Sequence, residues 1–146
     1  MSSVQWQITS ASPGTWNVLG LRVEDTSSAE AAWPAFFTGM PAQWYPRMIE
    51  AAIGEVGAGS DAVGVIFPGD LDALDLMERP PIPPDSVEIY CHSFASVMLP
   101  RATFYAVLLA LGEQLLERPG QPGDWYPALR TALQNLRAKI SRDRPA

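Results

Sequence analysis

The chain contains few of the residues that build covalent or metal-based sites. It has one cysteine and one histidine among 146 residues. A single cysteine cannot form a disulfide within the chain, and the two residues together cannot supply a Cys/His zinc site. The sequence also lacks an apolar run of about 18 residues, the length that marks a membrane-spanning helix. We therefore expect no cofactor, no metal and no membrane partner.

Positive charge is scarce as well. Lys and Arg number 10 against 16 Asp and Glu, and the formal net charge is −6. Because a nucleic-acid-binding surface needs cationic side chains to neutralise phosphates, this balance argues against a nucleic-acid partner. The first residues lack the basic and apolar regions of a signal peptide, so we expect a cytoplasmic protein. The many Ala, Gly, Pro and Arg residues are typical of a bacterial, GC-rich genome.

The acidic charge is concentrated in the middle of the chain. Residues 50–88 hold nine carboxylates and one arginine, a formal charge of −8, whereas residues 130–146 carry a formal charge of +4. Surfaces of one sign steer and orient association with partners of the opposite sign. The central acidic stretch is therefore the first place to look for a binding surface.

Hydrophobic periodicity predicts alternating strands and amphipathic helices. The expected strands are residues 4–8 and 16–23, which form a hairpin, and residues 62–67, 86–91 and 94–99. The expected helices are residues 42–56, 101–117 and 125–140, with a short or broken helix at 29–37 and one or two turns at 70–79. This order predicts an α+β fold, with three main helices on an antiparallel or mixed sheet of four to five strands. We expect one domain over residues 1–141 and a frayed basic tail over 142–146.

Two local patterns refine these helices. The glycines at 57 and 59 are expected to end the helix over 42–56, as glycine commonly does. The tripeptide Trp-Tyr-Pro occurs at 44–46 and again at 125–127, in both cases where a helix is predicted to open. Proline is favoured in the first helical turn, so we interpret the match as shared helix-start chemistry rather than an internal repeat.

The neighbouring Cys91 and His92 are the obvious candidates for a nucleophile and base. Such a pair must meet side chain to side chain, but adjacent residues on a strand point to opposite faces. Cys91 shares a face with Val87 and Ile89, which predicts a small buried side chain. No Gly-x-Ser-x-Gly motif is present either. We therefore expect that the protein is not an enzyme.

A carboxylate cluster follows the strand predicted at 62–67. Asp70, Asp72 and Asp75 do not match a calcium loop, because position six would be Asp75 and position twelve Pro81. The cluster can be a solvated acidic loop, a partner-binding face or a magnesium site. The candidate partner-binding residues are Asp70, Asp72, Asp75, Glu78, Asp85, Glu88 and His92.

Part of the chain resembles the small immunity proteins that bacteria encode beside polymorphic toxins. The resemblance lies in a strand, residues 87–91 (Val-Glu-Ile-Tyr-Cys), followed by Leu99-Pro100-Arg101 and an apolar helix with Phe104-Tyr105 and residues 108–116. It covers about a fifth of the chain. It implies an inhibitor that binds a cognate toxin and blocks its active-site region, here expected to be basic. Without a signal peptide, the implied toxin acts in the cytoplasm.

Two other classes remain open. One is an acidic secretion chaperone or adaptor, which would be a stable homodimer that binds an unfolded client segment. The other is a small carboxylate-dependent enzyme using Glu88 with Asp85 or Asp70, which would place a buried carboxyl group in a concave pocket. An inhibitor instead predicts a tight, salt-sensitive one-to-one complex with a single toxin.

Overall fold

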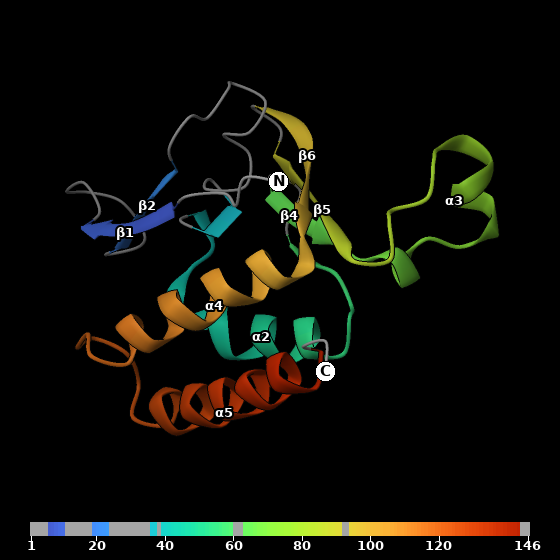
Figure 1. Ribbon diagram of the computed structural model, residues 1–146. Coiled ribbons are helices and arrows are strands. Elements are labelled where there is room, and N and C mark those ends of the chain that lie inside the picture. The colour runs from blue at the N-terminus through green and yellow to red at the C-terminus, as the bar shows by residue number, and fades with distance from the viewer. Residues whose placement is uncertain are drawn as a thin grey trace.

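The computed structural model of the chain describes residues 6–10, 19–23, 36–37, 39–59, 63–91 and 94–143. Side chains are described from residue 36 on, within these ranges and except for residues 94 and 95. Figure 1 shows two sheets and a group of helices. The strands are β1 (Trp6–Ser10), β2 (Leu19–Val23), β3 (Ala58–Gly59), β4 (Val63–Ile66), β5 (Ser86–Cys91) and β6 (Phe94–Pro100). The helices are α2 (Tyr45–Ile53), α3 (Ala73–Glu78), α4 (Arg101–Leu115) and α5 (Trp125–Asp143).

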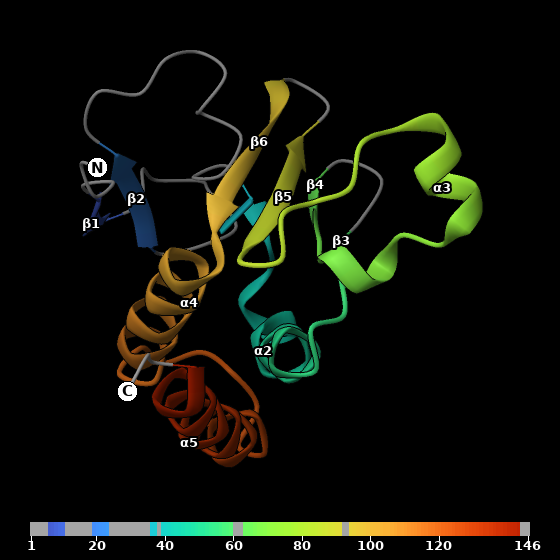
Figure 2. The ribbon, with the colours of Figure 1, turned by 45° about the vertical axis from the view of Figure 1, so that its right-hand side comes forward.

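These elements confirm the α+β fold. The main sheet has the order β3-β4-β5-β6 and every neighbouring pair is antiparallel. The strands β1 and β2 form the expected hairpin as a separate two-stranded sheet. Figure 2 shows α2, α4 and α5 together below the main sheet, with α4 continuing directly from β6. The three helices predicted as the main ones are thus the three long ones.

The core lies between the helices and one face of the main sheet. Val87 and Ile89 on β5 are fully buried, as their alternation predicts, whereas Cys91 is only half-buried. The register of β5 and β6 shifts between Ile89 and Cys91, so the strand loses its regular alternation there. On the helix side, Phe104 of α4 packs against Phe37 and Phe67, with ring centroids 5.5 and 5.9 Å apart.

Both Trp-Tyr-Pro segments open a helix, as expected, and they do so with the same contact. The Tyr45 hydroxyl donates to the carbonyl of Phe37 at 2.7 Å, and the Tyr126 hydroxyl donates to the carbonyl of Arg118 at 2.6 Å. Each tyrosine therefore ties its helix start to the chain eight residues earlier. Trp125 also donates its indole N–H to the carbonyl of Ala42 at 3.0 Å, which joins the starts of α2 and α5.

The expected helix over 42–56 is shorter and less regular than predicted. A 3-10 turn, η2 (Ala42–Trp44), precedes α2, and α2 ends at Ile53. Gly57 does not end the helix. A Cβ atom at Gly57 would lie 2.5 Å from the Val65 carbonyl oxygen and 2.7 Å from an oxygen of Asp70. Glycine is therefore needed there for close approach of the backbone to β4, and Gly59 belongs to β3.

At the other end, α5 continues to Asp143, two residues into the segment expected to be a frayed tail. Asp143 forms ion pairs with Arg101 at 3.7 Å and with Lys139 at 3.6 Å, and these contacts hold the end of the helix against α4. Residues 144–146 lie outside the described residues, as does most of the helix expected at 29–37.

Candidate functional site

Residues 68–85 form an arm that projects from the main sheet between β4 and β5 (Figures 1 and 2). The arm contains a 3-10 turn, η3 (Pro68–Asp70), and the short helix α3. It carries five carboxylates and one arginine, a formal charge of −4. Five of the nine carboxylates of the acidic stretch over residues 50–88 thus lie on one projecting element.

The start of the arm is fixed to the core. Phe67, the residue before η3, is fully buried against Phe104. Its backbone N–H donates to the Asp70 carboxylate at 2.7 Å, which closes the 3-10 turn. Asp70 therefore acts as a local cap that sets the direction in which the chain leaves the sheet.

A paired arginine holds the middle of the arm to the sheet. Arg79, just after α3, donates from both terminal nitrogens to Glu88 on β5, at 2.9 and 3.0 Å. The side chains of Arg79 and Glu88 are only 27% and 14% exposed. Hydrogen bonding to Glu88 raises the pKa of Arg79 above its ordinary value. Such two-pronged pairs combine strength with a fixed geometry.

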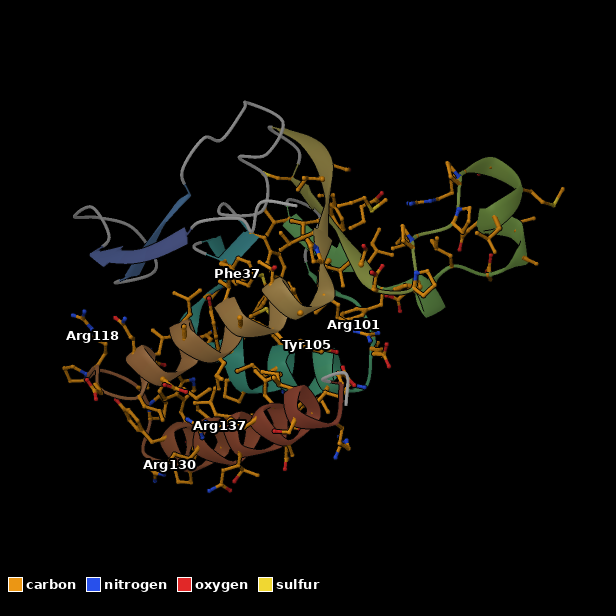
Figure 3. The ribbon with its side chains drawn as sticks, viewed as in Figure 1. Phe37, Arg101, Tyr105, Arg118, Arg130 and Arg137 are labelled. Atoms are coloured by element: carbon orange, nitrogen blue, oxygen red, sulfur yellow. The ribbon has the colours of Figure 1, made fainter. Side chains whose placement is uncertain are left out.

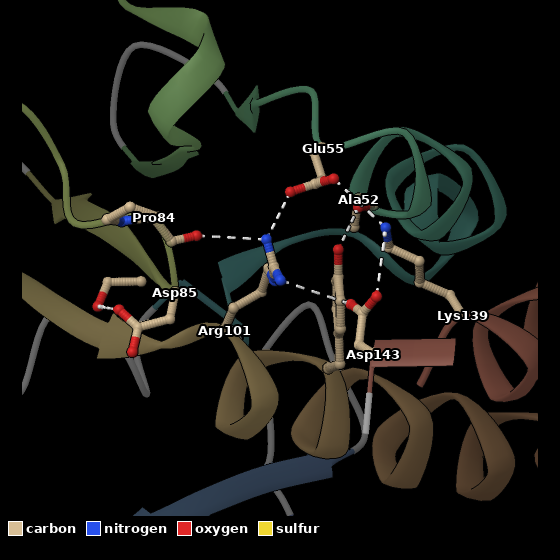
Figure 4. Close-up of polar contacts among 9 residues, drawn as sticks. Ala52, Glu55, Pro84, Asp85, Arg101, Lys139 and Asp143 are labelled. Atoms are coloured by element: carbon tan, nitrogen blue, oxygen red, sulfur yellow. Dashed lines mark hydrogen bonds and ion pairs between the residues drawn. The ribbon is translucent and has the colours of Figure 1, made fainter. Parts of the chain in front are cut away.

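The end of the arm is anchored to the helices, as Figure 4 shows. Arg101, the first residue of α4, donates its backbone N–H to the Asp85 carbonyl at 2.7 Å and its guanidinium to the Pro84 carbonyl at 3.3 Å. The same guanidinium donates to Glu55 at 2.5 Å. Lys139 also binds Glu55, at 3.3 Å. This network joins the arm to all three long helices.

The helix α3 has its own caps. The Asp75 amide donates to the Asp72 carboxylate at 2.8 Å, and the Asp72 amide donates to the Asp75 carboxylate at 3.0 Å. The hydrogen bond from the Asp75 amide holds the pKa of Asp72 below its usual value. This reciprocal capping box satisfies backbone donors that a helix start leaves unpaired. It stabilises a helix that is too short to persist alone in water.

The arm also exposes large apolar side chains. No residue of α3 is buried, and Leu74, Leu76 and Met77 are 70%, 45% and 81% exposed. Scattered apolar residues are ordinary on a surface, but a group of them on one projecting element makes that element a candidate interaction site. These residues were not predicted as part of the site. A signal for them was present in residues 72–78, where helical spacing places the apolar side chains on one side of a helix and the acidic side chains on the other.

The seven predicted site residues fall into different roles. Asp70, Asp72, Asp75, Glu78 and Asp85 all lie exposed on the arm. Asp70, Asp72 and Asp75 accept hydrogen bonds from nearby backbone N–H groups and act as local caps. Glu88, on β5, pairs with Arg79. Glu78 caps no helix in the described structure. His92 lies outside the described residues. The structure thus places five of the six predicted carboxylates on the arm and Glu88 on β5, and most of the six support the shape or position of the arm.

Three arginines that take no part in anchoring the arm lie away from it (Figure 3). Figure 3 shows Arg118, Arg130 and Arg137 at the opposite side of the molecule from α3. Arg137 pairs with Glu113 at 2.8 Å. The acidic arm and these three arginines therefore lie on different sides of the molecule (Figure 3).

Within the described ranges, no three His, Cys, Asp or Glu side chains are grouped so that they could hold a metal ion. Nor does any described helix have the length and apolar character to cross a membrane. Comparisons with protein-family models, with curated proteins and with solved structures gave no match.

Proposed function

We propose that the protein is an inhibitor that binds another protein, and that its partner is a bacterial toxin acting in the cytoplasm. The observation that supports this proposal most strongly is the arm, which is held at both ends and presents three large apolar side chains to solvent. Binding interfaces have an apolar centre and a polar rim. The arm has both kinds of side chain on one small element.

The anchoring of the arm favours binding over a passive loop. A short helix held in place by caps and ion pairs has already lost much of its conformational freedom. Less free energy is then spent on ordering when a partner binds, which increases affinity. The contacts of Asp70, Arg79 and Arg101 supply this order before any partner is present.

The other two classes receive less support from these contacts. Both oxygens of Glu88 accept hydrogen bonds from Arg79, and Asp70 caps a turn, so these carboxylates serve the structure. A chaperone for unfolded segments would offer an open groove. In contrast, Met77, the most exposed of the large apolar side chains that the structure describes, stands on a projection.

The proposal predicts that a toxin domain is encoded beside the gene for this chain, and the test uses that domain. That domain is expressed in bacterial cells with and without the chain, and binding is measured by titration calorimetry with the purified proteins. We expect the chain to restore growth and to form a one-to-one complex. Growth arrest that persists in the presence of the folded chain, with no heat of binding, would reject the proposal. A complex formed only with an unfolded segment would favour the chaperone class.

A further inference from the structure

The helix α3 divides into two arcs of opposite character. Successive residues turn by about 100° around a helix, so Ala73, Leu74, Leu76 and Met77 share one side. The acidic residues Asp72, Asp75 and Glu78 lie on the other side of the helix. We call these sets the apolar arc and the acidic arc. All seven residues are exposed.

We propose that the apolar arc is the binding epitope, and that it enters an apolar pocket of the partner bordered by Lys or Arg side chains. This inference rests on the proposed function and specifies the contact that it requires. In a soluble domain the apolar side of an amphipathic helix packs onto the core. Here no described residue of the chain buries it.

The charge of the arm indicates which kind of partner would bind it. The arm has a formal charge of −4, and its one arginine is already paired with Glu88. The acidic arc therefore faces outward beside the apolar one, without a compensating cation on the arm. A second copy that docked arm to arm would bring a like charge against it, and an anionic membrane would repel it. A protein pocket with a cationic border satisfies both arcs together.

The charge of the acidic arc can be tested only at a carboxylate whose reversal does not disturb α3. Asp72 and Asp75 cap α3, so reversal of either would also disturb the helix. Glu78 is exposed and lies outside this capping box. Glu78→Lys therefore changes the charge of the acidic arc and leaves the cap intact.

The apolar contact is tested with Met77→Ser and Leu74→Ser. The matched control is Met98→Ser, which removes the same kind of side chain from β6, where Met98 is 44% exposed. Binding of each variant to the toxin domain that binds the wild-type chain is measured by calorimetry. Truncating a central interface side chain typically weakens binding by about 10-fold to 100-fold. We expect such a loss for Met77→Ser and Leu74→Ser, and less than about 3-fold for Met98→Ser.

The charge is tested by repeating the titrations over a range of salt concentrations. We expect wild-type affinity to fall as salt rises, and Glu78→Lys to bind more weakly and with less salt dependence. Salt-independent binding, or unchanged binding by Glu78→Lys, would overturn the inference that Lys or Arg side chains border the partner's pocket. Sedimentation equilibrium of the chain alone adds a further check. A dimer that Met77→Ser dissociates would show that a second copy occupies the apolar arc and would overturn the inference.

The outcomes separate this inference from the proposed function. If the wild-type chain neither binds nor neutralises the toxin domain, the proposed function fails. If the wild-type chain binds and Met77→Ser binds equally well, the function stands and the epitope is wrong. Equal losses for Met77→Ser and Met98→Ser would also contradict the inference, because they would place the contact on the sheet as well as the arm.

Discussion

The pair between Arg79 and Glu88 should hold the arm in position, so Glu88→Gln should loosen the arm. An exposed ion pair contributes about 0–1 kcal/mol, and loss of one partner from a buried pair costs about 3–5 kcal/mol. At 27% and 14% exposure the two side chains lie between these cases. We therefore expect a cost of about 1–2 kcal/mol, which makes local opening about 10-fold more frequent.

Hydrogen exchange on the millisecond timescale, read by mass spectrometry, measures this opening in the peptide over residues 67–85. Exchange there should accelerate about 10-fold in Glu88→Gln, while peptides from α4 and α5 keep their wild-type rates. The matched control is Glu113→Gln, which removes the exposed pair with Arg137 and should leave the arm unchanged. Unchanged exchange of the arm in Glu88→Gln, or equal acceleration in the control, would refute the positioning role of this pair.

Three further predictions concern stability and pH. Tyr105 is 1% exposed, donates to the Ala52 carbonyl at 2.8 Å and has a pKa raised to about 12 by burial. Because the unfolded tyrosine ionises near pH 10, this residue should remove about 3 kcal/mol of stability as pH rises from about 10 to 12. Urea unfolding measured across this pH range should show that the loss of stability due to Tyr105 is absent in Tyr105→Phe. A Cβ at Gly64 would overlap the ring of Tyr90, so Gly64→Ala should cost about 1–3 kcal/mol in the same assay, with partial recovery when Tyr90→Ala is added. The lowered pKa of Asp72 means that its carboxylate stabilises α3 above about pH 4 and loses this effect as pH falls through the lowered value. Exchange of α3 amides, corrected for the intrinsic effect of pH, should therefore accelerate in acid, and Asp72→Asn should remove that change.

The long elements could be predicted because local pattern and burial agree in them. Val87 and Ile89 alternate on a strand that the core buries, and Leu108 and Leu111 recur at helical spacing on α4. The end of α2 was predicted wrongly, because Gly57 is required by the approach of β4 and Asp70 rather than by a helix terminus. Such contacts between distant segments leave no local pattern.

The candidate site, like the fold, could be predicted from the sequence only in part. The carboxylates of the arm were found from their charge alone, but their roles were not. Whether Asp72 caps a helix or faces a partner depends on backbone geometry, and whether Glu88 is free depends on Arg79, nine residues away. The exposed apolar side chains of α3 were missed, because a sequence pattern does not reveal whether a helix lies on the core or projects from it.

The most direct measurement is the hydrogen-exchange footprint of the toxin domain on the chain. Binding of the toxin domain should slow exchange most strongly in residues 67–85, by at least about 10-fold at the α3 amides. The basic side with Arg118 and Arg130, opposite the arm in Figure 3, should show little change. Slowed exchange confined to that side, or to the sheet without the arm, in a complex that still neutralises the toxin would show that the arm is not the surface that binds the toxin.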